Sequence, residues 1–280
     1  MGGTAREPRP GPDTLPGATT RLSDRIRNGT WNGLTDRFQI DAGFFRINAN
    51  TVLHLTRGTG ATSAVDFEND LDIKPIANTF WVDTTWRVGK RHQLKLAYTK
   101  LTRESQGKTL SRTFTWNDKQ FSAGLSASST LGTNMTSGYY RFALVRKERF
   151  EIGPAVGVGY LTLTAGIKAS GNLTLPGSPT QVAQLDESGS YGHITGDVGA
   201  YVNAWASTRA VVRGDFLYVA AFGGTVTDSR LSLDYYVTTH VGLGVQYKYN
   251  KFSYDKDVQK ASLGGDLTYK GAQVFASFLF

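Results

Sequence analysis

Ten segments of this chain alternate apolar and polar residues with a period of two, the side-chain period of a β-strand. The clearest is 241–250, whose apolar members are Val241, Leu243, Val245, Tyr247 and Tyr249. The ten segments are 37–57, 79–88, 93–103, 135–145, 150–165, 191–205, 210–222, 229–238, 241–250 and 264–280. A strand with one apolar and one polar face needs apolar surroundings on one side only. The pattern therefore predicts an all-β protein.

The links between these segments alternate in length. Short links lie near 89–92, 146–149, 206–209 and 239–240, and longer polar links are 58–78, 104–134, 166–190, 223–228 and 251–263. Short turns at one rim and long loops at the other are typical of transmembrane β-barrels, and soluble sandwiches show no such alternation. We expect a single antiparallel up-and-down transmembrane β-barrel of about ten strands over residues 37–280. An even strand number places both of its ends at the short-turn rim.

Two other strand numbers, twelve and eight, are alternatives. Residues 108–129 would supply one more hairpin and give twelve strands. In that arrangement Arg112 would face lipid beside Phe114, and a charge on the lipid face at the bilayer midplane costs about 2–4 kcal/mol. We therefore expect ten strands, with 108–129 extending outside the membrane.

Composition restricts the remaining classes. No window of about 18 consecutive apolar residues occurs, so no transmembrane helix is expected, and a mean hydropathy of −0.28 suits strands that meet lipid only at alternate residues. The chain has no cysteine, which excludes disulfides, thiolate metal sites and a cysteine nucleophile. The net charge of +8 is scattered among acids, without the basic, aromatic-rich stripe of a nucleic-acid site. We expect no nucleic-acid partner and no cofactor.

Residues 1–36 are polar and irregular, with prolines at 8, 10, 12 and 16. We expect a flexible N-terminal lead on the periplasmic side, or a segment that folds under the barrel or docks a partner. The opening MGGTAREPRPGPDTLPG has no apolar signal core. If the protein is exported, its signal has been removed or replaced.

The last strand carries a family resemblance. Val274, Phe278 and Phe280 are apolar at alternate positions, with the smaller Ala272 and Ala276 in the same series. Together with the alternating strands and the loop asymmetry, this resembles Gram-negative bacterial outer-membrane β-barrel proteins over about residues 37–280. The resemblance implies the bacterial outer membrane, periplasmic termini and contact with outer-membrane lipid and lipopolysaccharide. It also implies that Val274, Phe278 and Phe280 form the signal that the barrel-assembly machinery reads.

A narrower resemblance rests on four motifs, which are AGFFRI (42–47), DFENDLDI (66–73), FWVDTTWR (80–87) and RHQLKLAY (91–98). They are similar to a group of uncharacterised proteobacterial outer-membrane barrels. This implies a fold and no mechanism. A mitochondrial porin, with nineteen strands and short loops, does not fit the spacing.

The polar face of the strands carries charges of both signs in equal number. They are Asp41, Asp83, Arg87, Lys95, Arg141, Asp197, Arg213, Asp215, Asp234 and Lys248. A ten-strand barrel is narrow, and unpaired charges in its lumen would be expensive. We expect a closed, salt-bridged lumen and a non-enzymatic protein with a structural or interaction role, through its loops or N-terminal lead. A narrow channel for small polar solutes or ions is the alternative, although a mixed-sign lining argues against ion selectivity.

Two weaker candidates concern catalysis and metal binding. His54 and His193 fall near the long-loop rim, and Asp197 follows His193 by four residues. Nothing local brings a nucleophile to a base, so no catalytic residue is assigned and a rim-located lipid- or peptide-modifying enzyme stays a third alternative. Asp66, Glu68 and Asp70 could offer oxygens to Ca²⁺. They lack the turn glycine and terminal glutamate of the twelve-residue calcium loop, so a solvated acidic loop is expected.

Overall fold

In a computed structural model of the protein, the described residues are 38–56, 63–116, 119–147, 149–173, 181–207, 209–221, 224–238, 240–254 and 262–280. The predicted N-terminal lead lies outside them. All regular secondary structure in the described part is β-strand. Among these residues, no helix has the length and apolar character needed to cross a membrane.

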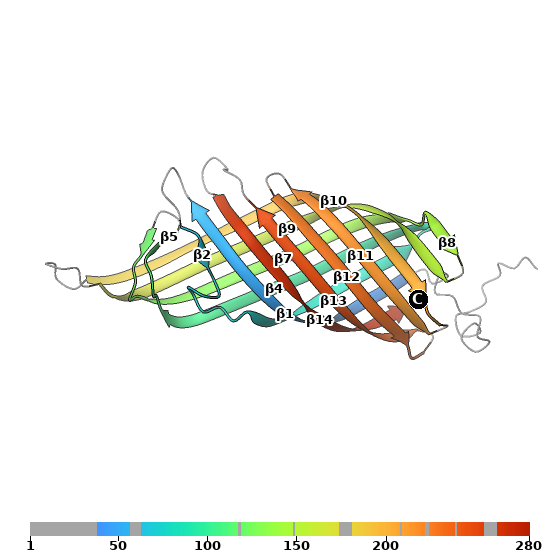
Figure 1. Cartoon of the computed structure of the whole chain (residues 1–280), viewed down its shortest axis with the longest axis horizontal. Coiled ribbons are helices and arrows are strands. Elements are labelled where there is room, and N and C mark those ends of the chain that lie inside the picture. The colour runs from blue at the N-terminus through green and yellow to red at the C-terminus, as the bar shows by residue number, and fades with distance from the viewer. Residues whose placement is uncertain are drawn as a thin grey trace, which may run out of the picture.

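Ten antiparallel strands form a closed barrel, as predicted (Figure 1). The barrel strands are β1 (Phe38–Thr56), β3 (Ile76–Arg87), β4 (His92–Thr109), β7 (Ser126–Phe142), β9 (Phe150–Leu173), β10 (Gln181–Trp205), β11 (Ala210–Ala221), β12 (Gly224–Tyr236), β13 (Val241–Tyr254) and β14 (Ser262–Leu279). Each pairs with the next in chain order, and β14 pairs with β1 from Gln39↔Leu279 to Thr56↔Ser262. The ring of pairings leaves no open edge around the barrel wall, which removes the aggregation risk of an edge strand.

Four short strands lie outside the ring. β2 (Val65–Asp66) continues the pairing on β1 beyond the start of β3, and β8 (Val145–Lys147) pairs with the beginning of β9. β5 (Phe114–Trp116) and β6 (Lys119–Phe121) form a separate hairpin. Residues 108–129 therefore hold the end of β4, this hairpin and the start of β7, and they add no strand to the barrel.

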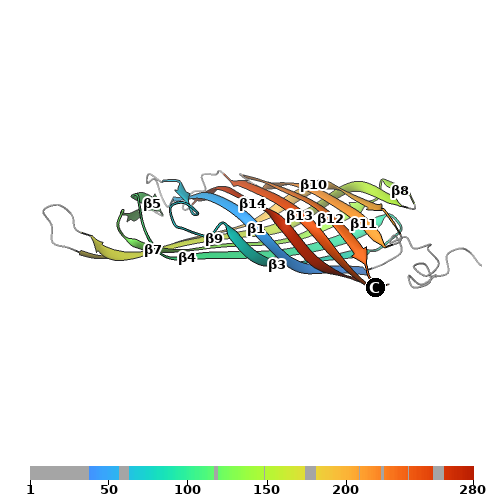
Figure 2. The ribbon, with the colours of Figure 1, turned by 60° about the horizontal axis from the view of Figure 1, so that its bottom comes forward.

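The two ends of the barrel differ, and we name them the turn end and the loop end. The turn end holds the links 88–91, 143–149, 206–209 and 237–240, and both Phe38 and Phe280 lie there, joined by two backbone hydrogen bonds of 3.2 and 2.8 Å. The loop end holds the other five links. Figures 1 and 2 show that β4, β7, β9 and β10 extend well past β1 and β11–β14 at the loop end, which is on the left in both views.

Four strands, β4, β7, β9 and β10, run at least six residues past the bounds that the alternation predicted. The predicted loops 104–134 and 166–190 are largely strand, because β4 runs to Thr109, β7 starts at Ser126, and β9 and β10 pair from Gln181↔Leu173 downwards. The predicted loop 223–228 is also mostly strand, since β12 begins at Gly224. In the parts of these strands nearest the loop end, the apolar residues point inward and the polar residues point outward. This is the reverse of the pattern on which the prediction is based.

The outward surface is apolar only over the half of the barrel nearer the turn end. On β1 the outward side chains change from Phe44 to Arg46, Asn48 and Asn50, and on β14 they change from Val274 to Lys270. We call the outward apolar residues the apolar belt. On β13 it covers 241–249, which matches the roughly 9–11 residues that a tilted strand needs to cross a bilayer. The belt consists of exposed side chains, among them Phe44, Phe80, Trp86, Leu94, Leu96, Val156, Val158, Ile194, Phe216, Leu231, Leu233, Leu243, Val245, Tyr247, Val274 and Phe278.

The interior is divided in the opposite sense. Behind the apolar belt it is filled with paired charges, which we call the charge tier. Nearer the loop end it is filled with buried apolar side chains, which we call the apolar tier. The predicted charge-filled lumen thus occupies only part of the barrel.

Candidate functional site

The charge tier is built from the inward-facing residues of eight of the ten barrel strands, all except β10 and β14. Because alternate residues of a strand share a face, one polar residue at every second position is enough to line the lumen. Its ionic members are Asp41, Asp83, Arg87, Lys95, Arg141, Glu151, Arg213, Asp215, Asp228, Arg230, Asp234 and Lys248.

Asp215 and Asp83 form the centre of the network. Asp215 on β11 accepts from Arg141 on β7 and lies 3.2 Å from Lys95 Nζ, which also lies 2.9 Å from Asp83. Arg230 on β12 reaches Asp83 at 2.7 Å. These bonds join β3, β4, β7, β11 and β12 across the lumen, so the side chains brace opposite walls.

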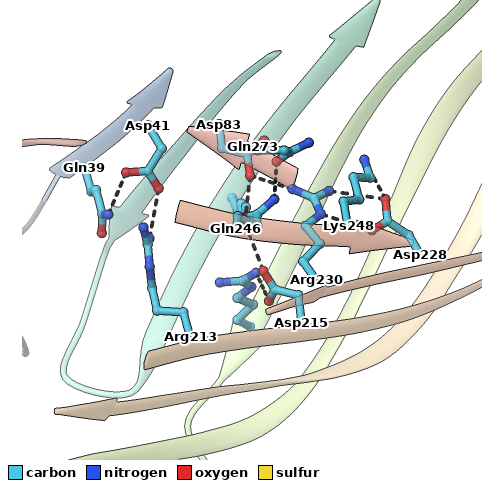
Figure 3. A network of polar contacts seen from close by, with 12 residues as sticks. Gln39, Asp41, Asp83, Arg213, Asp215, Asp228, Arg230, Gln246, Lys248 and Gln273 are labelled. Atoms are coloured by element: carbon cyan, nitrogen blue, oxygen red, sulfur yellow. Dashed lines mark hydrogen bonds and ion pairs between the residues drawn. The ribbon is translucent and has the colours of Figure 1, made fainter. Parts of the chain in front are cut away.

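Arg230 also connects this centre to a second group (Figure 3). Its Nε lies 3.1 Å from Asp228, which lies 3.0 Å from Lys248 Nζ. Lys248 also lies over the ring of Tyr269, 5.7 Å from its centroid. The charge tier therefore passes directly into the apolar tier at this contact.

A third group lies towards the turn end. Arg213 pairs with Asp41 at 2.9 Å and with Asp234, and Gln39 donates to Asp41 at 2.8 Å. On the other side of the lumen, Glu151 is fully buried and accepts from Tyr201 Oη at 2.8 Å, from Gln93 and from Arg87. Each carboxylate thus has a cation or an amide donor, as a buried charge requires.

The ten predicted lumen residues all face the interior, and nine of them form ion pairs. Asp197 instead accepts from Thr195 Oγ1 at 2.8 Å. The prediction missed Asp228, Arg230 and Glu151. Asp228 and Arg230 share the inward face of β12 with Ser232 and Asp234. They lie four and two residues before Ser232, so continuing the period-two pattern towards the N-terminus of the strand predicts both. Glu151 shares the face of Gly157 in the same way.

The apolar tier closes the lumen above the charges. Phe45, Leu131, Leu163, Phe252 and Leu267, from five different strands, are all buried in one cluster. The loop-end segments pack onto it, with Phe67 against Trp116 at 5.6 Å between ring centroids, and with Phe114 stacked on Phe121 at 5.4 Å. Among the described residues, close packing of this kind fills the interior beyond the charge tier with apolar side chains.

The acidic side chains of Asp66, Glu68 and Asp70, the calcium candidates, instead fasten their loop through contacts within the protein. Asp66 accepts the backbone N–H of Asn69 at 2.8 Å, Glu68 accepts that of Thr51 at 2.7 Å and pairs with Arg103, and Asp70 pairs with Arg112. The hydrogen bond from Arg112 lowers the pKa of Asp70 below its usual value. Within the described residues, no group of three His, Cys, Asp or Glu side chains is arranged to hold a metal ion.

The two histidines near the loop end lie on opposite faces of the wall. His54 follows the outward series of β1, and His193 follows the inward series of β10, where it pairs in register with Leu161. The structure therefore does not bring them together. Val274, Phe278 and Phe280, the predicted assembly signal, lie on the outward surface at β14 and are all exposed.

Two cavities lie within or beside the charge tier. One of about 50 Å³ opens among inward residues nearest the turn end, including Gln39, Arg87 and Leu279. A second of about 10 Å³ lies deeper, next to Asp83 and Arg230. The turn-end cavity is bordered by the turn-end collar, a separate apolar cluster of Trp205, Val211, Tyr236 and Leu279.

Comparisons with known proteins agree with this geometry at the level of fold. No protein-family model and no curated protein sequence matches the chain. Among solved structures, it is similar to the outer membrane protease OmpT of Escherichia coli, with a TM-score of 0.55, 10% identity, and coverage of 88% of this chain and 97% of that one. The translocator domain of autotransporter NalP from Neisseria meningitidis gives a TM-score of 0.47, 12% identity and coverage of 92% and 93%. The attachment invasion locus protein Ail of Yersinia pestis gives 0.37, 8% identity and coverage of 88% and 99%. The fold is that of Gram-negative outer-membrane β-barrels, as in this protease.

Proposed function

We propose that this protein is a non-conducting, non-enzymatic outer-membrane barrel whose role is structural or interactive and is carried by its loop end. The observation that supports this most is that two layers of side chains, the charge tier and the apolar tier, fill the lumen one after the other. The charge tier closes the half behind the apolar belt, and the apolar tier closes the half beyond it. Cavities of about 50 and 10 Å³ lie within the charge tier, and neither reaches across the apolar tier.

The position of the apolar belt supports an orientation. Beyond the belt, β4, β7, β9 and β10 rise into a polar-surfaced wall, whereas the links of the turn end are short. Long, raised loops face outside the cell in barrels of this class. We therefore infer that the loop end is extracellular, that the turn end and the termini are periplasmic, and that outer-membrane lipid covers the belt. Passage through the barrel-assembly machinery is part of the same proposal.

Single-site labelling tests this orientation, because the chain has no cysteine of its own. We expect Gln184→Cys, exposed on β10 near the loop end, to react with a membrane-impermeant maleimide on intact cells. Ser207→Cys, in a turn-end link, is the matched control and should react only after the outer membrane is opened. The reverse result would contradict the orientation.

Planar-bilayer conductance tests the closed lumen. We expect no steady single-channel current from the wild type. Replacing Asp228, Arg230 and Lys248 by alanine removes part of the charge tier, yet the apolar tier should keep this variant silent. Replacing Leu131, Leu163 and Phe252 of the apolar tier by alanine should also leave a silent barrel, because the charge tier still fills the half behind the apolar belt.

The two sets of substitutions combined provide the positive control. We expect steady currents from that variant alone, after heat-modifiable migration on gels has shown that it is folded. Steady currents from the wild type would overturn the closed assignment and favour the narrow channel.

A further inference from the structure

The turn-end cavity has an unusual lining for a lumen in which charges are balanced. Three arginines line it, Arg87, Arg141 and Arg213, together with the amide side chains of Gln39, Gln93 and Asn203. No aspartate or glutamate lines it. The acids that pair with these arginines are Glu151, Asp215, Asp41 and Asp234, and of these Asp41 and Asp215 line the deeper cavity instead. The cavity is therefore surrounded by donors.

Two of these arginines have an Nε–H group with no acceptor among the described residues. Arg141 is nine-tenths buried and directs one guanidinium nitrogen to Asp215, but its buried Nε has no hydrogen-bond partner among the described residues. Arg213 pairs through both terminal nitrogens, and its Nε is likewise buried and unpartnered. A buried donor without an acceptor costs free energy comparable to a lost hydrogen bond. Both arginines line the cavity, and we expect an oxygen-bearing anion there to draw their guanidinium groups towards it, so that these donors gain an acceptor.

The rim around the cavity raises the local concentration of anions. The sequence of the four turn-end links contains one acid, Glu148, and six basic residues, which are Lys90, Arg91, Arg146, Lys147, Arg149 and Arg209. Arg146 bridges two of these links by donating to the carbonyl of Lys90. Burial, followed by the nearby Arg87 guanidinium, lowers the pKa of Arg146. A strong excess of positive charge around a mouth with low-dielectric walls attracts anions.

We propose that the turn-end cavity is a binding site for a small oxyanion of the phosphate or carboxylate class. Guanidinium forks match the spacing of such oxygens, which favours an oxyanion over chloride. A cavity of about 50 Å³ has room for a few water-sized groups, which suits a single small anion. The turn-end collar of Trp205, Val211, Tyr236 and Leu279 borders the cavity and excludes bulky ligands.

The site is blind, because the apolar tier lies beyond it. It therefore goes beyond the proposed function without depending on it. Conductance measures whether the lumen is closed, and calorimetry measures whether an anion binds in the turn-end cavity. The failure of either measurement leaves the other interpretable.

Calorimetric titration of the full chain in a neutral detergent tests the site, with inorganic phosphate as the probe. Acetate is the carboxylate probe, and sodium chloride at equal ionic strength measures screening alone. We expect saturable heat with phosphate or acetate and none with chloride. Equal responses to chloride, or no saturable heat with either oxyanion, would overturn the proposal.

The decisive variant is Asn203→Asp, which adds a carboxylate inside the cavity with almost no change in volume. Asn203 pairs in register with Arg213, so the new charge competes with the ligand for that guanidinium. We expect the affinity for phosphate to fall at least about tenfold. Asn48→Asp, on the outward face of β1, adds the same charge elsewhere and should leave the affinity unchanged.

A second variant protects the test against a folding defect. Thr85→Glu places a carboxylate in the same cavity from β3, opposite Lys95 in register. We expect the same loss of phosphate binding in a barrel that still shows heat-modifiable migration. Wild-type affinity in a folded Asn203→Asp or Thr85→Glu protein would place the anion elsewhere and reject the site.

Discussion

At the scale of single residues, the lumen shows which charges hold the wall together. Asp228 is fully buried and contacts two cations, Arg230 at 3.1 Å and Lys248 at 3.0 Å. Asp186 on β10 has a similar contact with Lys168 at 2.9 Å, but both side chains are more than half exposed. Similar distances therefore correspond to different contributions to the free energy of unfolding, because water screens the exposed pair and does not screen the buried one.

This difference gives the first prediction. Asp228→Asn leaves Arg230 and Lys248 facing each other in the buried network, and it should lower the free energy of unfolding by about 3–5 kcal/mol. Asp186→Asn is the matched control and should change it by less than about 1 kcal/mol. Urea unfolding in detergent, followed by tryptophan fluorescence, measures both. Equal effects would show that the lumen pairs are as well solvated as the surface pair.

Asp70 carries the second prediction at this scale. The hydrogen bond from Arg112 lowers its pKa from the usual 3.8 in the folded protein. A depressed folded pKa means that the contact stabilises the loop end fully above the unfolded value, and that this stabilisation is lost as pH falls through the folded value. Because Arg112 is 46% exposed, we expect a small effect on global stability.

Carboxyl chemical shifts, followed during a pH titration, measure the Asp70 pKa directly. We expect it to rise towards 3.8 in Arg112→Ala. Lys119→Ala removes a more distant contact of the same hairpin region, to Glu187 at 3.7 Å, and should leave the Asp70 value in place. An unchanged pKa in Arg112→Ala would contradict the assigned cause.

At the scale of elements, the sequence predicted the ten strands but not how far several of them extend towards the loop end. The prediction assumes outward apolar and inward polar residues, and this pattern holds only behind the apolar belt. Near the loop end of β9, Leu163, Ala165 and Ile167 face inward while Thr164 and Lys168 face outward. This is the pattern of a strand in water. Sequence alone did not place the level at which the surroundings change.

The candidate site was predictable to a similar degree. A strand period of two sufficed to place ten charges in the lumen, since each side chain's face follows from its position. Which charges pair across the lumen depends on the register of strands far apart in the chain, such as Arg230 with Asp83. The cavity beside Arg141 and Arg213 depends on where those pairs leave space, which no local pattern records.

The packing of β14 against β1 gives an element-scale prediction. Gly265 has a φ of +132°, and a Cβ there would lie 2.1 Å from the carbonyl oxygen of Val52. Gly265→Ala should therefore destabilise the barrel by more than about 1 kcal/mol. Gly196→Ala, on the outward face of β10 with no heavy atom within 4 Å of the new methyl, should change stability by less than about 0.5 kcal/mol. Both are compared by urea unfolding, and a neutral Gly265→Ala would show that β1 and β14 can separate locally.

At the scale of the whole molecule, the interior and the outer surface of the barrel have opposite polarity in each half. The half with the apolar outer surface has a charged interior, and the half with the polar outer surface has an apolar interior. Behind the apolar belt, burying apolar side chains would gain little, since lipid is as apolar as the side chains themselves. There the interior is held by charge pairs, such as Arg213 with Asp41 at 2.9 Å. Beyond the belt the outer surface is polar, and an apolar interior gains the full hydrophobic effect. The change of tier inside and the end of the belt outside thus have one cause, the upper boundary of the membrane.

The end of the apolar belt places the membrane boundary between Phe44 and Arg46 on β1, and a charge introduced on either side of this boundary tests that placement. Val245 lies at the middle of the belt on β13, with 56% of its side chain exposed. Val245→Arg should lower the free energy of unfolding in lipid vesicles by about 2–4 kcal/mol, because it moves a charge to the bilayer midplane. Asn50→Arg adds the same group to the outward face of β1 beyond the belt, where water solvates it, so it should cost about 0–1 kcal/mol. In detergent micelles, which adapt to the protein, the two costs should converge. If Asn50→Arg instead proved as costly as Val245→Arg in vesicles, the hydrocarbon would extend past the belt, and the apolar tier would lie inside the membrane.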